Sequence, residues 1–403
     1  MRLRLDRGRQ RAGRGGAVGE AQDDRGTRRR SVGPVTQRTK PPFRADHVGS
    51  LLRTQALKDA RAKREKNEIT AEQLREVEDR EIGAIVRKQE EVGLHSITDG
   101  EFRRAFWNYD FLGKLPGVEA YLGERKIQFQ GKQPRPMMLR VTGKLGAYAP
   151  HPMIEHFKFL AANTRRTPKM TIPSPSSLHF RYGRSAVPES IYPDMAEFYR
   201  DLGVSYRKAV RAFADAGCRY LQLDEVNFTY LCDTKLRQVV KDRGEDPDAL
   251  PHVYAEMLNT AISDIPADMT IAMHLCRGNF QSTFVASGGY EPVADILFNT
   301  VKVPNYFMEY DSDRAGGFEP LRFVPKGKNV VLGLVTSKSG TLESKDTLKR
   351  RIDEASKFIS LDQLCLSPQC GFASTEEGNI LAEDEQWAKL RTIVEVAEEV
   401  WGK

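Results

Sequence analysis

A histidine and a cysteine stand two residues apart at the end of an apolar stretch, in the segment IAMHLCRGNF at 271–280. Residues 271–273 predict a buried strand. Because alternate residues of a strand point to the same side, we expect His274 and Cys276 to leave the strand end together. An imidazole and a thiol placed in this way can bind a metal ion, but the same pair is also compatible with simple core packing.

Polar residues also follow the other predicted strands, directly at their carboxyl ends. None of them lies in the middle of a predicted helix. In a parallel α/β barrel the carboxyl ends of all strands meet at one mouth, so we expect these side chains to gather there. They are His47, Gly49 and Ser50 after the first strand, Asp99, Glu101 and Trp107 after the second, Asp224 and Glu225 after the fourth, Glu309 and Asp311 after the sixth, and Cys370 after the eighth.

Glu309 and Cys370 strengthen the interpretation of His274 and Cys276 as metal ligands. Together the four residues offer nitrogen, sulfur and oxygen donors, which is a set that zinc accepts. Two thiolates favour zinc over magnesium or calcium. Taken singly, Glu309 also fits a solvated charge or an ion pair, and Cys370 also fits core packing.

The elements that must position these residues alternate along the chain between strands and helices. Several predicted strands are short apolar runs without alternation, which is typical of parallel strands covered on both faces. This order predicts a (β/α)8 TIM-type barrel, with a doubly wound open sheet as the alternative. The alternative is less favoured because no glycine-rich dinucleotide turn follows the first strand. The predicted strands are 44–50, 94–102, 169–175, 219–225, 269–276, 305–311, 329–335 and 361–370, and the predicted helices are 71–93, 195–217, 348–359 and 383–401.

One segment breaks this rhythm. Residues 125–148, RKIQFQGKQPRPMMLRVTGKLGAY, alternate between polar and apolar side chains as a β-hairpin does. We expect this hairpin insertion to cap the barrel.

The positive charge of the chain is confined to its N-terminal part. Residues 1–40 contain 12 Lys or Arg and 4 Asp or Glu, whereas 41–403 contain 50 basic and 51 acidic residues. The first 40 residues show no apolar periodicity, so we interpret them as a disordered basic extension and 41–403 as one barrel domain. A transit peptide or a nucleic-acid-binding arm is the less favoured alternative, and a secretory signal is excluded because no apolar segment follows the charges.

The remaining composition points to a cytoplasmic protein. The five cysteines are odd in number and far apart in a long chain, which argues against a disulfide framework and for a reducing compartment. No run of 18 apolar residues exists, so we expect no membrane span. We expect small-molecule partners, and neither a membrane nor a nucleic acid.

The motifs HLC, FMEYD and SPQCG occur in this order, with HVGS near the start of the barrel and LQLDE in its middle. In this arrangement 41–400 resembles the catalytic barrel of cobalamin-independent methionine synthase, and most of all its short single-barrel homologues. The resemblance implies zinc bound by His274, Cys276, Glu309 and Cys370. It also implies that homocysteine contacts Val48, Gly49 and Ser50, and that Glu101 and Asp224 hold its amino group.

The implied reaction is methylation of the homocysteine thiol, with 5-methyltetrahydrofolate (polyglutamate) as the donor. A free thiol has a pKa near about 8.5, so zinc binding is what keeps the sulfur as a nucleophilic thiolate. The departing folate nitrogen needs a proton. The large enzyme of the family takes it from a histidine after the seventh strand, but this chain reads LGLVTSKSGTLES there, so His47 or His179 are the substitutes we consider. Trp107 is placed either as a stacking partner for the pterin or as a buried wall residue.

Two other functions remain open on the sequence. The chain lacks the N-terminal barrel of the large enzyme, which leaves the donor less defined than the acceptor. Another zinc-dependent thiol alkyltransferase, using coenzyme M, an epoxide or a methylcorrinoid, is therefore the first alternative. A metal-free barrel similar to uroporphyrinogen decarboxylase, or a non-catalytic protein, is the second.

Overall fold

The computed structural model describes residues 38–123 and 129–402, and its core is a parallel six-stranded sheet. Every strand of this sheet is paired in parallel with its neighbours, in the order β10-β9-β8-β7-β6-β5. Almost all residues of these strands are buried, as the lack of alternation predicts. The strands are β5 (Met170–Pro173), β6 (Tyr220–Glu225), β7 (Thr270–Leu275), β8 (Asn305–Glu309), β9 (Asn329–Val335) and β10 (Leu364–Pro368).

Two further strand positions close the sheet into a ring. β1 (Ser96–Ile97) pairs in parallel with β4 (Thr167–Pro168), and only Lys169 separates β4 from β5. The first predicted strand, 44–50, is reduced to one bridge between Ala45 and Leu366 of β10. These eight positions confirm the predicted TIM-type barrel.

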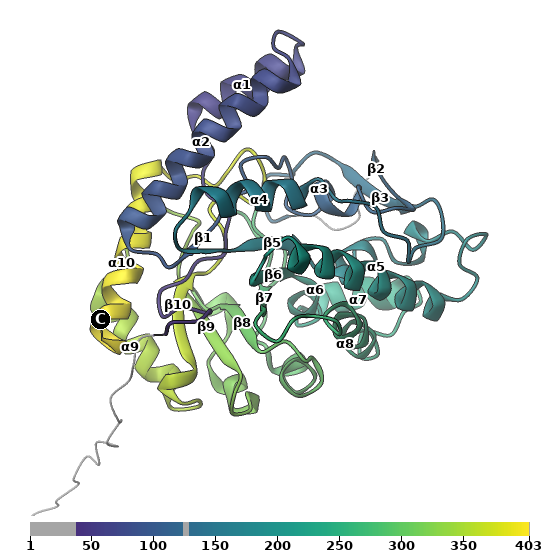
Figure 1. Ribbon diagram of the computed structural model, residues 1–403. Coiled ribbons are helices and arrows are strands. Elements are labelled where there is room, and N and C mark those ends of the chain that lie inside the picture. Colours follow the sequence, from purple (N-terminus) through teal and green to yellow (C-terminus); the bar gives the residue numbers. More distant parts are fainter. Residues whose placement is uncertain (1–37, 124–128, 403) are drawn as a thin grey trace, which may run out of the picture. The chain divides into compact units, whose positions relative to one another are not determined.

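Helices cover the outside of the barrel, with α5 and α8 on one side and α9 and α10 on another (Figure 1). Between β7 and β8 and between β8 and β9 the chain returns through short 3-10 and π-helical turns instead. Their starts follow capping chemistry: the Thr70 side chain caps α2 in a capping box with Gln73, and Ser344 caps α9. No helix in the described ranges is long and apolar enough to cross a bilayer. The helices are α1 (Gln55–Glu65), α2 (Ala71–Val92), α3 (Tyr109–Leu112), α4 (Met153–Asn163), α5 (Met195–Asp215), α6 (Asn227–Tyr230), α7 (Thr234–Asp242), α8 (Leu250–Ala261), α9 (Lys345–Ser356) and α10 (Glu383–Trp401).

The barrel interior contains a buried ion pair among apolar side chains. Lys169 Nζ lies 3.3 Å from Asp46 Oδ1, and both side chains are fully buried. Asp46 also accepts hydrogen bonds from Ser96 Oγ at 2.7 Å and from the Tyr220 hydroxyl at 2.9 Å. A buried charge is tolerated only when it is paired and hydrogen-bonded, and here one carboxylate connects the first, second, third and fourth strand positions.

The antiparallel hairpin begins earlier than predicted. It consists of β2 (Val118–Leu122) and β3 (Met137–Val141), so only its second strand falls inside the predicted segment 125–148. The alternation of residues after 125 was misleading, and 124–128 lie outside the described residues, as does most of the predicted extension. Further on, Gln130 N donates to Phe284 O at 2.8 Å, and Phe129 packs on Phe280 with ring centroids 5.7 Å apart. The insertion therefore reaches the loop that follows β7.

Candidate metal and substrate site

Three of the four predicted metal ligands lie together at the mouth of the barrel. The ligand atoms of His274, Cys276 and Cys370 are all within 4.8 Å of one another, and all three residues are buried. Both ring nitrogens of His274 lack a hydrogen-bond partner in the described part of the chain. A buried imidazole without partners is costly unless something binds it. One imidazole and two thiols fit zinc, and three protein ligands with an open position are the pattern of catalytic zinc sites.

The charges within this cluster are tightly linked. Contact with Cys276, together with the neighbouring His274, holds the pKa of the Cys370 thiol well below its usual range. Contact with Cys370 and burial raise the pKa of Cys276. Burial disfavours the charged form of His274, but the adjacent Cys370 and Asp224 outweigh it and raise its pKa.

Glu309, the fourth predicted ligand, is held elsewhere. It is fully buried at the end of β8 and is not among the side chains that meet within 4.8 Å. Its Oε2 accepts the Arg277 N–H at 2.8 Å, and its Oε1 forms an ion pair with Nη2 of Arg314. Its charge still raises the pKa of Cys276, so it lies near the cluster without joining it.

A cavity of about 460 Å³, counting the part open to solvent, lies over the cluster. Gly49 does not line this cavity, but its neighbours Val48 and Ser50 do. The backbone turns at Gly49 with a φ of +137°, and a Cβ at this position would lie 2.8 Å from Thr171 Cγ2, so the turn requires glycine. Five of the residues predicted to bind substrate share the cavity with the three metal donors. They are Val48, Ser50, Glu101, Trp107 and Asp224.

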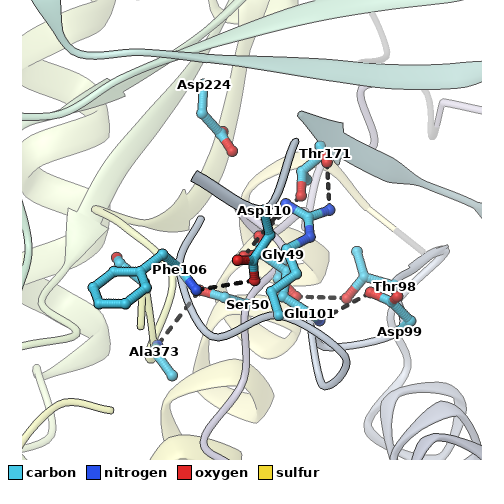
Figure 2. A network of polar contacts seen from close by, with 12 residues as sticks. Gly49, Ser50, Thr98, Asp99, Glu101, Phe106, Asp110, Thr171, Asp224 and Ala373 are labelled. Atoms are coloured by element: carbon cyan, nitrogen blue, oxygen red, sulfur yellow. Dashed lines mark hydrogen bonds and ion pairs between the residues drawn. The ribbon is translucent and has the colours of Figure 1, made fainter. Parts of the chain in front are cut away.

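The two predicted amino-group ligands are both buried carboxylates. Oε1 of Glu101 accepts the Thr171 hydroxyl at 2.9 Å, and its Oε2 has no hydrogen-bond partner in the described chain, although Arg104 Nη1 lies 3.5 Å away. Asp224 accepts one hydrogen bond, from Gln222 Nε2 at 2.7 Å. Figure 2 shows the network around Glu101 and Thr171, with Asp224 beside it and not hydrogen-bonded to it. Burial, opposed by His274 and reinforced by the Glu101 charge, raises the pKa of Asp224 to about 7.

Neither histidine considered as the proton donor lines this cavity. His47 is buried with its Nε2 3.1 Å from Ser96 O, and burial and Lys169 lower its pKa to about 4. His179 lies between two tyrosines, with Nδ1 2.9 Å from the Tyr254 hydroxyl and Nε2 2.9 Å from the Tyr199 hydroxyl. Both histidines are held by hydrogen bonds outside the lining of this cavity, and their catalytic role stays a prediction.

Among the cavity residues that the sequence did not predict, four carry polar or aromatic groups of interest: Phe129, Arg181, Tyr230 and Asn279. The guanidinium of Arg181 lies 5.9 Å from the Trp107 ring and forms no ion pair with any carboxylate in the described ranges. The Tyr230 hydroxyl is buried and has no partner there. A cation eight residues after β5 and a tyrosine inside a short helix carry no sequence signal that would have singled them out.

A family described as "Cobalamin-independent synthase, catalytic domain" matches residues 43–399 of the chain. The protein YxjH of Bacillus subtilis, which is described as uncharacterised, is 52% identical over 366 residues, covering 90% of this chain and 96% of YxjH. The 5-methyltetrahydropteroyltriglutamate–homocysteine methyltransferase of Bacillus velezensis is 24% identical over 361 residues. That match covers 87% of this chain but only 42% of the longer enzyme.

Among solved structures, one neighbour is a protein of Listeria monocytogenes, provisionally named a vitamin-B12-independent methionine synthase. It is 42% identical to this chain, with a TM-score of 0.74, and the match covers 91% of this chain and all of the Listeria chain. The fold is therefore shared with a solved relative.

Proposed function

The chain belongs to the family of the cobalamin-independent synthase catalytic domain, and from that premise we propose that it methylates the thiol of homocysteine to form methionine, with bound zinc and a methylfolate donor. The observation that carries the proposal is the His274, Cys276 and Cys370 cluster on the floor of a cavity that also holds two buried carboxylates. A thiol-binding metal and an ammonium-binding acid pair in one cavity match the two ends of homocysteine.

His274, Cys276 and Cys370 would hold the zinc, which when bound keeps the acceptor sulfur deprotonated at neutral pH. Asp224 and Glu101 would bind the ammonium group of the amino acid, because each has an oxygen free to accept a further hydrogen bond. The Ser50 hydroxyl faces the same cavity and suits the carboxylate end. These contacts orient the sulfur toward the donor, and such positioning is a large part of what an enzyme contributes.

In the transfer, a bond forms between the sulfur and the methyl carbon while the bond from that carbon to the folate nitrogen breaks. The nitrogen keeps the electron pair and takes up a proton. Tyr230 lines the cavity, and burial raises the pKa of its hydroxyl, so the group keeps its proton at neutral pH; it is the donor that we favour in place of the two histidines.

The outer wall of the cavity supports a planar, anionic methyl donor. Trp107, Phe129 and Tyr230 supply aromatic faces, and Arg181 supplies a guanidinium without a carboxylate partner in the described chain. A pterin ring can stack on such faces, and the glutamate carboxylate of a folate matches the guanidinium. A sulfonium donor would meet the repulsion of Arg181.

A second candidate function keeps the same acceptor chemistry but changes the donor. The chain matches only 42% of the length of the B. velezensis methyltransferase. A donor presented by another protein, such as a methylcorrinoid, would not require a counterpart of the rest of that enzyme. The acceptor could also be another small thiol such as coenzyme M.

Metal analysis combined with activity assays tests these proposals. Protein grown with zinc should contain one zinc per chain and convert homocysteine to methionine with a methylfolate. Parallel assays should pair homocysteine and coenzyme M with methylfolate and methylcobalamin. Zinc-loaded protein that methylates homocysteine only from methylcobalamin would favour the second candidate, and protein that retains no zinc would contradict both.

A further inference from the structure

Arg181, the cation on the outer wall of the cavity, lies in the middle of a tight turn that follows β5. The Gly183 N–H closes this turn by donating to His179 O at 2.7 Å. The Arg181 guanidinium lies 5.9 Å from the centre of the Trp107 ring, and both residues line the cavity. The place of this cation in the cavity therefore depends on what holds the turn at 179–183.

An ion pair in the segment between α7 and α8 contacts this turn at several points. Arg243 Nη1 donates to Phe180 O inside the turn, and Arg243 Nε donates to Glu245 Oε2 at 2.6 Å. The other carboxylate oxygen of Glu245, Oε1, lies 3.2 Å from His179 Nε2. At Gly183, where φ is +57°, a Cβ would lie 3.0 Å from Arg243 Nε, so the guanidinium lies directly against the backbone of the turn. One ion pair thus contacts both ends of the turn.

Water has little access to these contacts. The side chains of Arg243 and Glu245 are only 18% and 19% exposed, and His179 beyond them is fully buried. The His179 ring is fixed in addition by the hydroxyls of Tyr199 on α5 and Tyr254 on α8, each 2.9 Å from one of its nitrogens. A charge-assisted hydrogen bond is stronger than a neutral one, and screening weakens it least where water is excluded. The turn is therefore held by strong contacts that are anchored on the helices outside the barrel.

We propose that the ion pair of Arg243 and Glu245 positions Arg181 for the methyl donor by holding the 179–183 turn. The inference rests on the proposed function, in which Arg181 binds the glutamate carboxylate of a folate. Neither member of the pair is among the described residues that line the cavity, so the pair acts on the donor only through the turn. A guanidinium that is already in place binds a carboxylate without a further ordering cost. The pair therefore lowers the KM for the donor and leaves the binding of homocysteine and zinc unaffected.

The test uses the full chain loaded with zinc, with 5-methyltetrahydrofolate as the donor. Arg243→Met removes the guanidinium but keeps an unbranched side chain. Glu245→Gln keeps the shape of the carboxylate and removes its charge, and it replaces the first variant if that one fails to fold. Arg237→Met is the matched control, because Arg237 lies on α7 and pairs with Asp248 instead of contacting the turn.

Two readouts separate positioning from a general loss of structure. Steady-state kinetics give kcat and the KM for the donor, and calorimetry gives the affinity for homocysteine. The emission of Trp107 reports on the neighbouring Arg181 without any substrate, and it is isolated by subtracting the spectrum of the same protein carrying Trp107→Phe.

In Arg243→Met we expect the donor KM to rise about tenfold, the effect of losing one hydrogen bond to a charged group. The affinity for homocysteine and the zinc content should not change, whereas the emission of Trp107 should shift. Glu245→Gln should have the same effects to a smaller extent, and Arg237→Met should have none of them. In an Arg181→Met background, Arg243→Met should raise the donor KM no further, because the two changes act on the same contact.

Two results would overturn the inference while leaving the proposed function intact. One is folded Arg243→Met or Glu245→Gln protein whose donor KM and Trp107 emission equal those of the wild type. The other is a rise in the donor KM on Arg243→Met that persists in the Arg181→Met background, because the pair would then act elsewhere. If even the wild type transfers no methyl group from the methylfolate to homocysteine, the proposed function is contradicted, and the Trp107 emission still decides whether the pair holds Arg181.

Discussion

At the scale of single residues, the candidate site depends on three buried metal-donor side chains that do not fully satisfy one another's hydrogen-bonding capacity. His274 has no hydrogen-bond partner within the described ranges, and the thiols of Cys276 and Cys370 lie close to it. Such an arrangement gains most from a cation that binds all three, because binding gives the unsatisfied nitrogen a partner. Metal retention is therefore the most direct measure of what these residues do.

The first prediction concerns the two thiols. Cys276→Ser and Cys370→Ser should each weaken zinc binding by more than about 100-fold, since even outer contacts of metal sites contribute 10- to 100-fold. Cys218→Ser should retain zinc, because Cys218 is buried near β6 and donates to Tyr220 O at 3.3 Å. Zinc content after dialysis against a chelator measures the difference. Equal zinc content in all three variants would remove the thiols from the metal site.

The second prediction concerns the acid pair. Asp224→Asn and Glu101→Gln should each weaken homocysteine binding by about 1.5–3 kcal/mol, the usual range for hydrogen bonds to charged groups. The substitutions keep the shapes of the side chains, remove their charges and replace one acceptor oxygen with an NH2 donor. Calorimetry on the zinc-loaded protein provides the measurement, with Asp346→Asn as the control because that side chain is 95% exposed. If both variants bind homocysteine as the wild type does, the amino group lies elsewhere.

At the scale of elements, the barrel is closed by side chains where its backbone ladder is short. The first strand position forms a single bridge, between Ala45 and Leu366, and β1 contains two residues. Thr98 Oγ1 donates to Gly49 O at 2.6 Å across this seam, and the imidazole of His47 lies 3.1 Å from Ser96 O. Hydrogen bonds from buried side chains thus replace part of the backbone pairing between the first strand position and β1. Because one of these side chains is a histidine, the stability of this part of the barrel depends on protonation.

The third prediction follows from His47. Burial, reinforced by Lys169 and opposed by Asp46, lowers its folded-state pKa from 6.5 to about 4. Between these values the unfolded chain binds a proton that the folded chain does not, so the free energy of unfolding falls as the pH drops from 6.5 to 4 and then levels off. The share of His47 in this loss is roughly 3 kcal/mol.

Urea unfolding at pH 7 and pH 4 tests this share. In His47→Gln, the loss of stability on acidification should be smaller than in the wild type by about that amount, although the variant starts from a lower stability at pH 7. His252→Gln, at an exposed position, is the control. The same pH dependence in both variants would show that His47 is not held neutral in the folded protein.

The sequence located most elements of the barrel because their signals are local. β9 is apolar after its first residue, and β7 is apolar from Ile271 up to the predicted ligand His274. The helices α2 and α10 match their predicted ranges to within one residue. The hairpin was misplaced because alternation alone does not identify which two segments pair. The positions of Glu309 and the two histidines depend on contacts between residues far apart in sequence, such as Glu309 with the Arg277 backbone, and no local pattern encodes them.

At the scale of the whole molecule, residues 41–403 are close to electrically neutral and the net positive charge lies in residues 1–40, the predicted extension. The described chain begins at Arg38, which already contacts the barrel: Nη2 donates to Asp362 O at 2.9 Å. A deletion intended to leave the barrel intact should therefore end at residue 37 rather than at residue 40, the predicted domain boundary.

The last prediction is that deleting 2–37 leaves the melting temperature, the turnover and the KM for the methyl donor unchanged within error. The arginines of this extension would attract an anionic donor through a salt-sensitive field, with a screening length of about 8 Å at physiological ionic strength. Attraction of this kind does not fix geometry, whereas methyl transfer requires the donor carbon to be aligned on the sulfur. The cavity already supplies a cation for the donor in Arg181. A tenfold rise in the donor KM on deletion, matched by adding high salt to the full-length protein, would instead place the extension in the donor site.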